Sequence, residues 1–153
     1  MAVSVKKPER SPLIDKNVVI RHATETDRVR IEGSLPAFGL AGIEVRDYEL
    51  TVAVEGSVII GVAGLRRLGD ARDTACVFVA EKRRNRGVGA AMVRHLIEYS
   101  PIDRVLVTTD LAKMFRSLGF AETPTDEESR RLLGIECGTN ARRGAVLMAY
   151  EKR

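Results

Sequence analysis

The pattern of apolar and polar residues predicts strands along six short stretches of the chain. Tyr48–Val54 alternates between apolar and polar residues, and Val105–Thr109 begins as a continuous apolar run typical of a buried strand. The other four stretches are Val18–His22, Val58–Leu65, Thr74–Val79 and Ala145–Tyr150. The residues Glu55–Ser57 separate the second stretch from the third, and their central glycine is typical of a hairpin turn. The polar segment Arg66–Arg72 is expected to be a turn as well.

Helical spacing appears in the second half of the chain. From Gly87 to Tyr99 the apolar residues recur every three or four positions, at Val88, Met92, Leu96 and Tyr99. Pro101 ends this helix. Two shorter helices are expected later, over Leu111–Leu118, which Gly119 closes, and over Asp126–Leu133.

The region after the first strand predicts another helix and a loop. Thr24 or Thr26 can cap the helix, since Glu25 and Asp27 favour its positively polarised start. Proline and glycine at positions 36, 39 and 42 then predict a loop with a short second helix. Hairpins early and a β-α-β unit late indicate an α/β or α+β fold with a mixed sheet.

Length and composition fit one soluble domain. We expect residues 17–153 to form it, preceded by a flexible polar arm over residues 1–16. No apolar run approaches the ~20 residues of a membrane span, and the first sixteen residues lack the apolar core of a signal peptide. Cys76 and Cys137 form no metal-type cluster, and Cys76 reads as a buried thiol. A reduced, cytoplasmic setting is expected.

The chemistry centres on the turn before the Gly87 helix. Four positive charges lie within five residues there, at Lys82, Arg83, Arg84 and Arg86. A helix start exposes unpaired N–H groups, and Gly87 and Gly89 let a phosphate approach them. Arginines add charge-assisted hydrogen bonds. The turn therefore suits a pyrophosphate. The alternatives are a solvated basic turn and glycines that serve only helix–sheet packing.

Two known phosphate-binding patterns fit poorly. A P-loop needs Gly, four residues, then Gly-Lys and Ser or Thr, and the chain has no such run. A dinucleotide fold would use Asp110 as its acidic residue, but Met92 occupies the third glycine position. Only 43 residues follow Asp110, too few for the remaining strands of that fold.

The run Arg84–Gly89 resembles the acetyl-CoA signature of the GNAT superfamily of N-acetyltransferases, which is Arg or Gln, two residues, Gly, one residue, then Gly or Ala. The stretch Val107–Phe120, a strand and a short helix ending in Leu-Gly-Phe, resembles a later motif of that family. The upstream hairpin also looks like the family's paired strands. The resemblance covers roughly Asp15 to Lys152, and it looks most like short amino-acid acetyltransferases related to N-acetylglutamate synthase.

The resemblance implies a mixed, mostly antiparallel sheet of six to seven strands, flanked by helices and splayed between the fourth and fifth strands. It implies acetyl-CoA as co-substrate and no metal. Strand backbone would pair with the pantetheine arm, and the glycine turn would hold the pyrophosphate. Lys82 or Lys113 could meet the adenosine phosphate or be plain surface lysines. The implied cofactor residues are Val77, Phe78, Val79, Arg84, Asn85, Arg86, Gly87, Val88, Gly89, Ala90, Lys113 and Phe115.

Family members use direct attack of an amine on the thioester, and many have a carboxylate before the pyrophosphate turn. Asp73 stands near that position as a candidate general base, with an exposed turn aspartate as the alternative. Tyr48 and His95 are further titratable candidates. Phe115 stands where a tyrosine often protonates the departing thiolate, and phenylalanine cannot do so.

The sequence thus predicts transfer of an acetyl group from acetyl-CoA to a primary amine of a small molecule, an amino acid first. Arg142 and Arg143 could meet a substrate carboxylate or lie in a solvated loop. A protein or peptide amine as acceptor and a non-catalytic CoA-binding sensor remain alternatives. Nucleic-acid and membrane partners are not expected, because aromatic residues make up only 5% of the chain and no apolar span exists. A homodimer is left open.

Overall fold

The computed structural model describes residues 17–68, 71–100, 104–109, 111–123 and 146–151. The arm over residues 1–16 and the helix expected over Asp126–Leu133 lie outside these ranges. In chain order the elements are β1 (Val18–His22), α1 (Glu25–Glu32), η2 (Pro36–Phe38), η3 (Val45–Asp47), β2 (Tyr48–Glu55), β3 (Val58–Leu68), β4 (Ala71–Val79), η4 (Glu81–Arg83), α2 (Val88–Tyr99), β5 (Arg104–Thr109), α3 (Ala112–Ser117), β6 (Ala121–Glu122) and β7 (Val146–Glu151).

The strands form one mixed sheet in the order β1-β2-β3-β4-β5-β7-β6. The β4–β5 pair is parallel and the other five pairs are antiparallel. Helix α2 makes the crossover between the two parallel strands. The predicted sheet of six to seven mostly antiparallel strands is confirmed.

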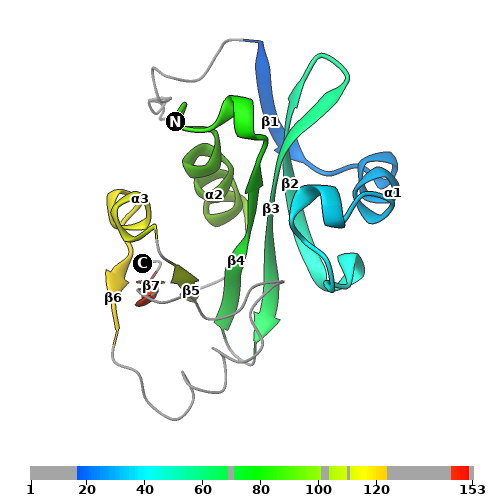
Figure 1. The fold of residues 1–153 in the computed structure, drawn as a ribbon. Helices are drawn as coiled ribbons and strands as arrows, with labels where there is room; N and C mark the ends of the chain where they lie inside the picture. The colour runs from blue at the N-terminus through cyan, green and yellow to red at the C-terminus, as the bar shows by residue number, and fades with distance from the viewer. Residues whose placement is uncertain (1–16, 69–70, 101–103, 110, 124–145, 152–153) are drawn as a thin grey trace, which may run out of the picture.

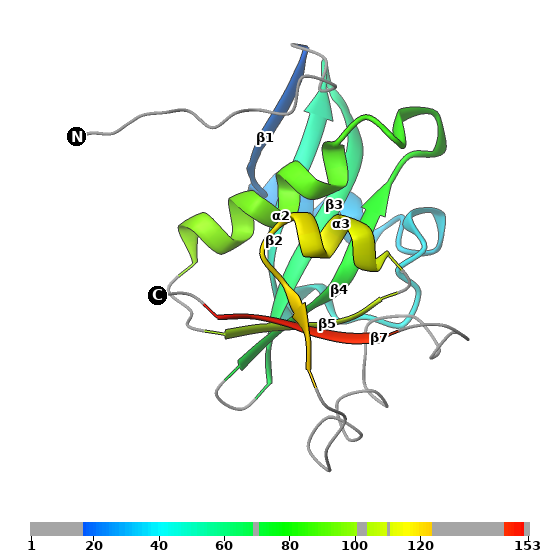
Figure 2. The ribbon, with the colours of Figure 1, turned by 90° about the vertical axis from the view of Figure 1, so that its left-hand side faces the viewer.

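Helices cover both faces of the sheet (Figures 1 and 2). Helices α2 and α3 lie on one face, and α1 with η2 and η3 lies on the other. A separate apolar cluster fills each interface. Phe115, Met92 and Val105 belong to the cluster under α2 and α3, while Ile31, Leu40 and Val52 belong to the cluster under α1. The first cluster lies beside the turn that the sequence singles out.

The expected turn over Arg66–Arg72 is mostly strand. Strand β3 continues to Leu68 and β4 begins at Ala71, with Arg67 paired to Arg72. Charged side chains at an exposed strand end cost little, so the loss of apolar alternation there did not mark the end of pairing. Strand β6, only two residues long, was not predicted at all.

Helix α2 lies directly on β3 because the strand presents a bare backbone there. A Cβ on Gly61 would come within 2.8 Å of the Met92 methyl group. The buried residues of α2 are Val88, Met92, Val93, Leu96 and Ile97. Tyr99, placed on this stripe by its spacing, is instead 62% exposed, because the contact face follows Val93 and Ile97.

Candidate functional site

Strands β4 and β5 run side by side only briefly. Among the described residues they pair at Arg72 with Val105 and at Asp73 with Leu106, and β4 then continues to Val79 without β5 (Figure 1). A gap therefore opens between the fourth and fifth strands, as the family resemblance implies.

A bulge in β4 begins just past the last β5 pair. Arg66 of β3 pairs with Asp73 and Gly64 pairs with Cys76, so Thr74 and Ala75 lie opposite the single residue Leu65. An inserted residue bends its strand and re-aims the backbone groups that follow it. The bulge thus lies at the vertex where β4 and β5 part.

Beyond the bulge, alternate backbone groups of β4 face the gap. The Ala80 N–H donates to Ile60 of β3 at 2.8 Å, so the groups of Val79 and Val77 point the other way. Arg84 confirms this direction, since its Nε donates to the Val79 carbonyl oxygen at 2.8 Å. The strand offers hydrogen-bonding groups to an extended partner in the gap.

The turn after β4 leads to the start of α2 through two residues with left-handed backbone. Asn85 has φ 63° and Gly87 has φ 81°. Gly87 is the N-cap of α2 and provides no side-chain cap. The first intrahelical donor is the Ala91 N–H, which bonds to Gly87 O at 3.0 Å. The N–H groups of residues 88–90 therefore have no intrahelical acceptor and create positive potential.

Packing does not require Gly89 to be a glycine. A Cβ there would lie 3.5 Å from Val79 Cγ2 and 3.8 Å from Met114 Sδ, which are ordinary contacts. The alternative that this glycine serves only tight helix–sheet packing is disfavoured.

The basic residues of the turn divide into two groups. The side chains of Lys82, Arg84 and Arg86 are exposed around the start of α2. Arg83 instead forms an ion pair with Glu55 of the β2–β3 hairpin, its Nε donating at 2.9 Å. Arg83 thus fastens the turn to the sheet rather than joining the exposed cations.

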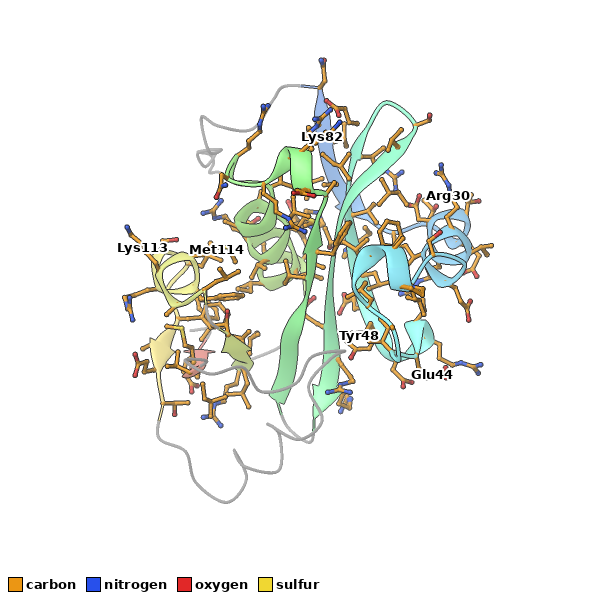
Figure 3. All side chains as sticks on the ribbon, viewed as in Figure 1. Arg30, Glu44, Tyr48, Lys82, Lys113 and Met114 are labelled. Carbon is orange, nitrogen blue, oxygen red and sulfur yellow. The ribbon has the colours of Figure 1, made fainter. Side chains whose placement is uncertain are left out.

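Three consecutive residues of α3, the predicted Lys113 and Phe115 and the unpredicted Met114 between them, lie in different surroundings. Lys113 is exposed, and Met114 lies near the start of α2 (Figure 3). Phe115 is 1% exposed, and its ring meets Phe120 edge to face with centroids 5.1 Å apart. Val88 is also buried, so only its backbone is offered to a ligand.

The opposite face of the sheet has its own aromatic and basic groups. The Phe38 and Phe78 rings have centroids 5.1 Å apart. The Arg66 guanidinium lies over the Tyr48 ring, 5.5 Å from its centroid. Tyr48 is 4% exposed, which makes it a platform rather than a solvated acid. Asp73 pairs with Arg66 through the backbone, so it belongs to β4 and not to an exposed turn.

His95 lies away from the gap. Its Nδ1 is 3.2 Å from the Thr51 hydroxyl on β2, and its ring meets those of His22 and Tyr99. Burial lowers the pKa of His95 below 6.5, the nearby His22 lowers it further, and Glu98 opposes the shift. This environment indicates a structural imidazole.

Neither a metal-binding cluster nor a membrane-spanning helix is found in the described part of the chain. No group of three or more His, Cys, Asp or Glu residues there could hold a metal ion. None of the helices there has the length and apolar character needed to cross a membrane.

The family comparison decides what this arrangement is. Residues 46–122, half of the chain, match the family model described as "Acetyltransferase (GNAT) domain". The chain belongs to the GNAT family. Residues 46–122 therefore form an acetyltransferase domain of the N-acetyltransferase type.

Solved structures of other GNAT proteins share the fold. N-Acetylglutamate synthase from Neisseria gonorrhoeae, complexed with coenzyme A and N-acetyl-glutamate, has a TM-score of 0.66 at 17% identity, over 97% of this chain and 37% of that one. A GNAT acetyltransferase from Elizabethkingia anophelis with acetyl-CoA bound has a TM-score of 0.60 at 17% identity, over 90% and 99%. A ribosomal-protein-alanine N-acetyltransferase from Escherichia coli has a TM-score of 0.58 at 15% identity, over 88% and 93%.

These identities show a common GNAT fold and no common substrate. The chain spans little more than a third of the length of the synthase. No curated protein matches it.

Two residues near the gap were not predicted, and three of the residues named from the sequence lie outside the described ranges. Sequence spacing did not single out Met114 or Arg66, because the contacts of each come from elements distant in the chain. The position of Met114 could have been found only from the register of its helix against α2, and that of Arg66 only from the pairing of its strand with β2 and β4. Arg142, Arg143 and Cys137 are outside the described residues.

Proposed function

We propose that the protein acetylates the primary amine of a small molecule, in first place an amino acid, by direct attack on acetyl-CoA. The observation that carries this proposal is the coincidence of two features on one strand. Strand β4 turns hydrogen-bonding groups toward the gap, and it leads straight into the uncapped start of α2. A long thioester with a pyrophosphate at one end matches that pair of features.

The chain would bind acetyl-CoA mainly through backbone. The N–H groups of residues 88–90 and the side chains of Arg84 and Arg86 would meet the pyrophosphate. The groups of Val77 and Val79 that face the gap would pair with the pantetheine arm. Gly89 has no side chain of its own to stand between the phosphates and the N–H groups at the helix start. The exposed Lys113 would add charge near the adenosine end.

The chemical step would occur near the bulge of β4. The neutral amine attacks the thioester carbon, the new C–N bond forms, the C–S bond breaks and the thiolate leaves. Backbone N–H groups near the bulge would stabilise the oxyanion. Asp73 would take the proton that the amine loses, directly or through a water. Binding both reactants in one gap supplies much of the rate enhancement.

The leaving thiolate would take its proton from solvent. Phe115 has no hydroxyl to donate, and its ring is enclosed in the core. The buried Tyr48 ring lies on the opposite face of the sheet, under Arg66. A thiol with pKa near 8.5 is a tolerable leaving group without a protein acid.

The fold of N-acetylglutamate synthase supports an amino acid as acceptor, with Arg142 and Arg143 as candidate partners of its carboxylate. The ribosomal-protein acetyltransferase of the same fold favours a protein or peptide amine. The two acceptors differ in size, so a panel of amines separates them.

The test is thiol release from acetyl-CoA with the twenty amino acids, several polyamines and peptides with free N-termini, with products identified by mass spectrometry. We expect amine-dependent release and an N-acetylated product with at least one amino acid. Release with peptides alone would transfer the proposal to protein amines. Tight acetyl-CoA binding without turnover of any amine would contradict catalysis and indicate a sensor.

A further inference from the structure

A row of four residues crosses the sheet at the level of the vertex. Tyr48 on β2 pairs with Arg66 on β3, Arg66 pairs with Asp73 on β4, and Asp73 pairs with Leu106 on β5. The last of these pairs is also where the gap begins. Arg66 of β3 therefore lies next to the start of the gap, where acetyl transfer is proposed to occur.

The side chain of Arg66 lies on the sheet face away from α2. Its guanidinium carbon lies over the Tyr48 ring, 5.5 Å from the ring centroid, and Tyr48 belongs to the apolar cluster under α1. The cofactor turn and α2 lie on the other face. An amine that approaches from the Tyr48 face would meet the thioester from the side opposite the helix.

Two hydrogen bonds from Arg28 hold the chain around Tyr48, and the ring fits because residue 64 is a glycine. Arg28 donates to the Tyr48 carbonyl at 2.8 Å and to the Val45 carbonyl at 3.1 Å. Gly64 leaves room for the ring, since a Cβ there would come within 3.0 Å of Tyr48 Cδ2. A ring held in place gives the guanidinium a defined position, because a cation is attracted to the face of an aromatic ring.

We propose that Arg66 binds the carboxylate of the acceptor, which makes the acceptor an α-amino acid rather than a polyamine or a lysine side chain. This rests on the proposed function and narrows its substrate. Guanidinium carries five donors in a fork that fits a carboxylate bidentately, so one further partner leaves enough donors for the substrate.

Strand spacing explains the choice of an α-amino acid. The backbones of Arg66 and Asp73 lie on adjacent strands, about 4.8 Å apart. An α-amino acid carries its amine and its carboxylate on one carbon. Such a substrate can place its carboxylate over β3 and its amine at the vertex of β4 and β5. A longer diamine has no negative group for the guanidinium.

The experiment compares an α-amino acid with its amide, for the best acceptor of the wild-type panel. The amide keeps the amine and the size but loses the negative charge. Rates are compared per neutral amine, because the two amines differ in pKa. The variants are Arg66→Gln, Arg66→Lys and the matched control Arg67→Gln, which removes an exposed charge from the next residue of β3. Thermal unfolding and acetyl-CoA affinity are measured for each.

We expect Arg66→Gln to raise KM for the amino acid about 10- to 100-fold and to change KM for the amide little. Arg66→Lys should recover part of the loss, and Arg67→Gln should behave as wild type. If Arg66→Gln raises both values of KM equally, or raises neither, the inference is wrong while the proposed function stands. If wild type prefers the amide or a polyamine, the inference fails and small-amine acetylation survives. If wild type acetylates no small amine, both fail.

Discussion

At the residue scale, Gly89 is where a small change should separate binding from folding. A Cβ at this position meets only ordinary contacts, so a side chain there need not disturb the helix. Replacing Gly89 with valine would add a branched side chain next to the exposed N–H groups at the start of α2, where the pyrophosphate is proposed to bind. We expect acetyl-CoA affinity to fall about 10-fold or more, measured by calorimetry.

Gly89→Ala is the matched control, because the family pattern accepts alanine at this position and alanine favours a helix over glycine. It should retain acetyl-CoA affinity and unfold at the same temperature or higher. A folded Gly89→Val variant with unchanged affinity would refute the site.

Asp73 carries the second prediction at this scale. Asp73→Asn keeps the shape of the residue and removes its ability to accept a proton. If Asp73 is the base, kcat should fall roughly 10²-fold while acetyl-CoA affinity stays the same. Rates are measured from pH 6 to 10, because a higher fraction of neutral amine would restore turnover in part. Intact turnover at neutral pH would show that water or the substrate's own basicity suffices.

Site residues can be predicted from the sequence when the residues that act together are also close together in the chain. The glycines, the arginines and the helix start of residues 84–90 are contiguous, so the sequence alone was enough to predict a common anion-binding turn. Arg66 is different. Its partners Tyr48 and Asp73 are 18 and 7 residues away, and only the strand register brings them level. Apolar alternation ends before Arg66, so the pattern gave no reason to pair it.

At the element scale, the start of α1 is the most strongly capped helix end described here. The Thr24 hydroxyl accepts from the Asp27 N–H at 3.1 Å, and the Asp27 carboxylate accepts from the Thr24 N–H at 2.8 Å. The hydrogen bond from the Arg21 guanidinium, together with those from Thr24, lowers the pKa of Asp27 from 3.8 to about 2 despite its burial. This arrangement ties α1 to the end of β1.

The depressed pKa predicts how acid affects this element. Because Asp27 is ionised more readily when folded, it contributes about 2 kcal/mol above pH ~4, and this is lost as the pH falls toward 2. Asp27→Asn should therefore lower the free energy of unfolding at pH 7 by roughly 1–2 kcal/mol. The difference from wild type, measured by urea unfolding, should shrink between pH 4 and 2. Asp47→Asn removes an exposed charge and should show neither effect.

Element prediction succeeded where apolar period and flanking signals agreed. The hairpin around Gly56 and the helix after Gly87 each combined both kinds of signal. The start of α1 was predicted from flanking residues alone, and of the two candidates Thr24 and Thr26 the structure shows Thr24 as the cap. It failed where tertiary contacts set the boundary. The two residues of β6 form a strand because β7 is beside them, and Tyr99 is exposed because α2 follows the sheet along Val93 and Ile97.

At the scale of the whole molecule, the proposed binding of acetyl-CoA between β4 and β5 predicts that acetyl-CoA stabilises the folded state. A ligand that binds only the folded state at 100 times its Kd adds about 2.7 kcal/mol. For a chain of this size we expect Tm to rise by roughly 5–10 °C, measured by calorimetry. Adenosine, which has no pyrophosphate or thioester arm, is the control and should shift Tm little.

Hydrogen exchange would locate that stabilisation. The amides of Val77 and Val79, which face the gap, should exchange more slowly with acetyl-CoA bound. The amide of Phe78, which faces β3, should change less. Equal protection across β4 would contradict a pantetheine arm lying along that strand.

The strand order also has a consequence for synthesis. Strand β7 lies between β5 and β6 in the sheet, although both are made before it. On the ribosome, strands β1 to β4 can pair as each hairpin emerges, because their partners are near in sequence. Strand β5 has no antiparallel partner, and β6 has none at all, until Val146–Glu151 has been translated. The β5 side of the gap is therefore completed last, after β4, the strand that is proposed to bind acetyl-CoA.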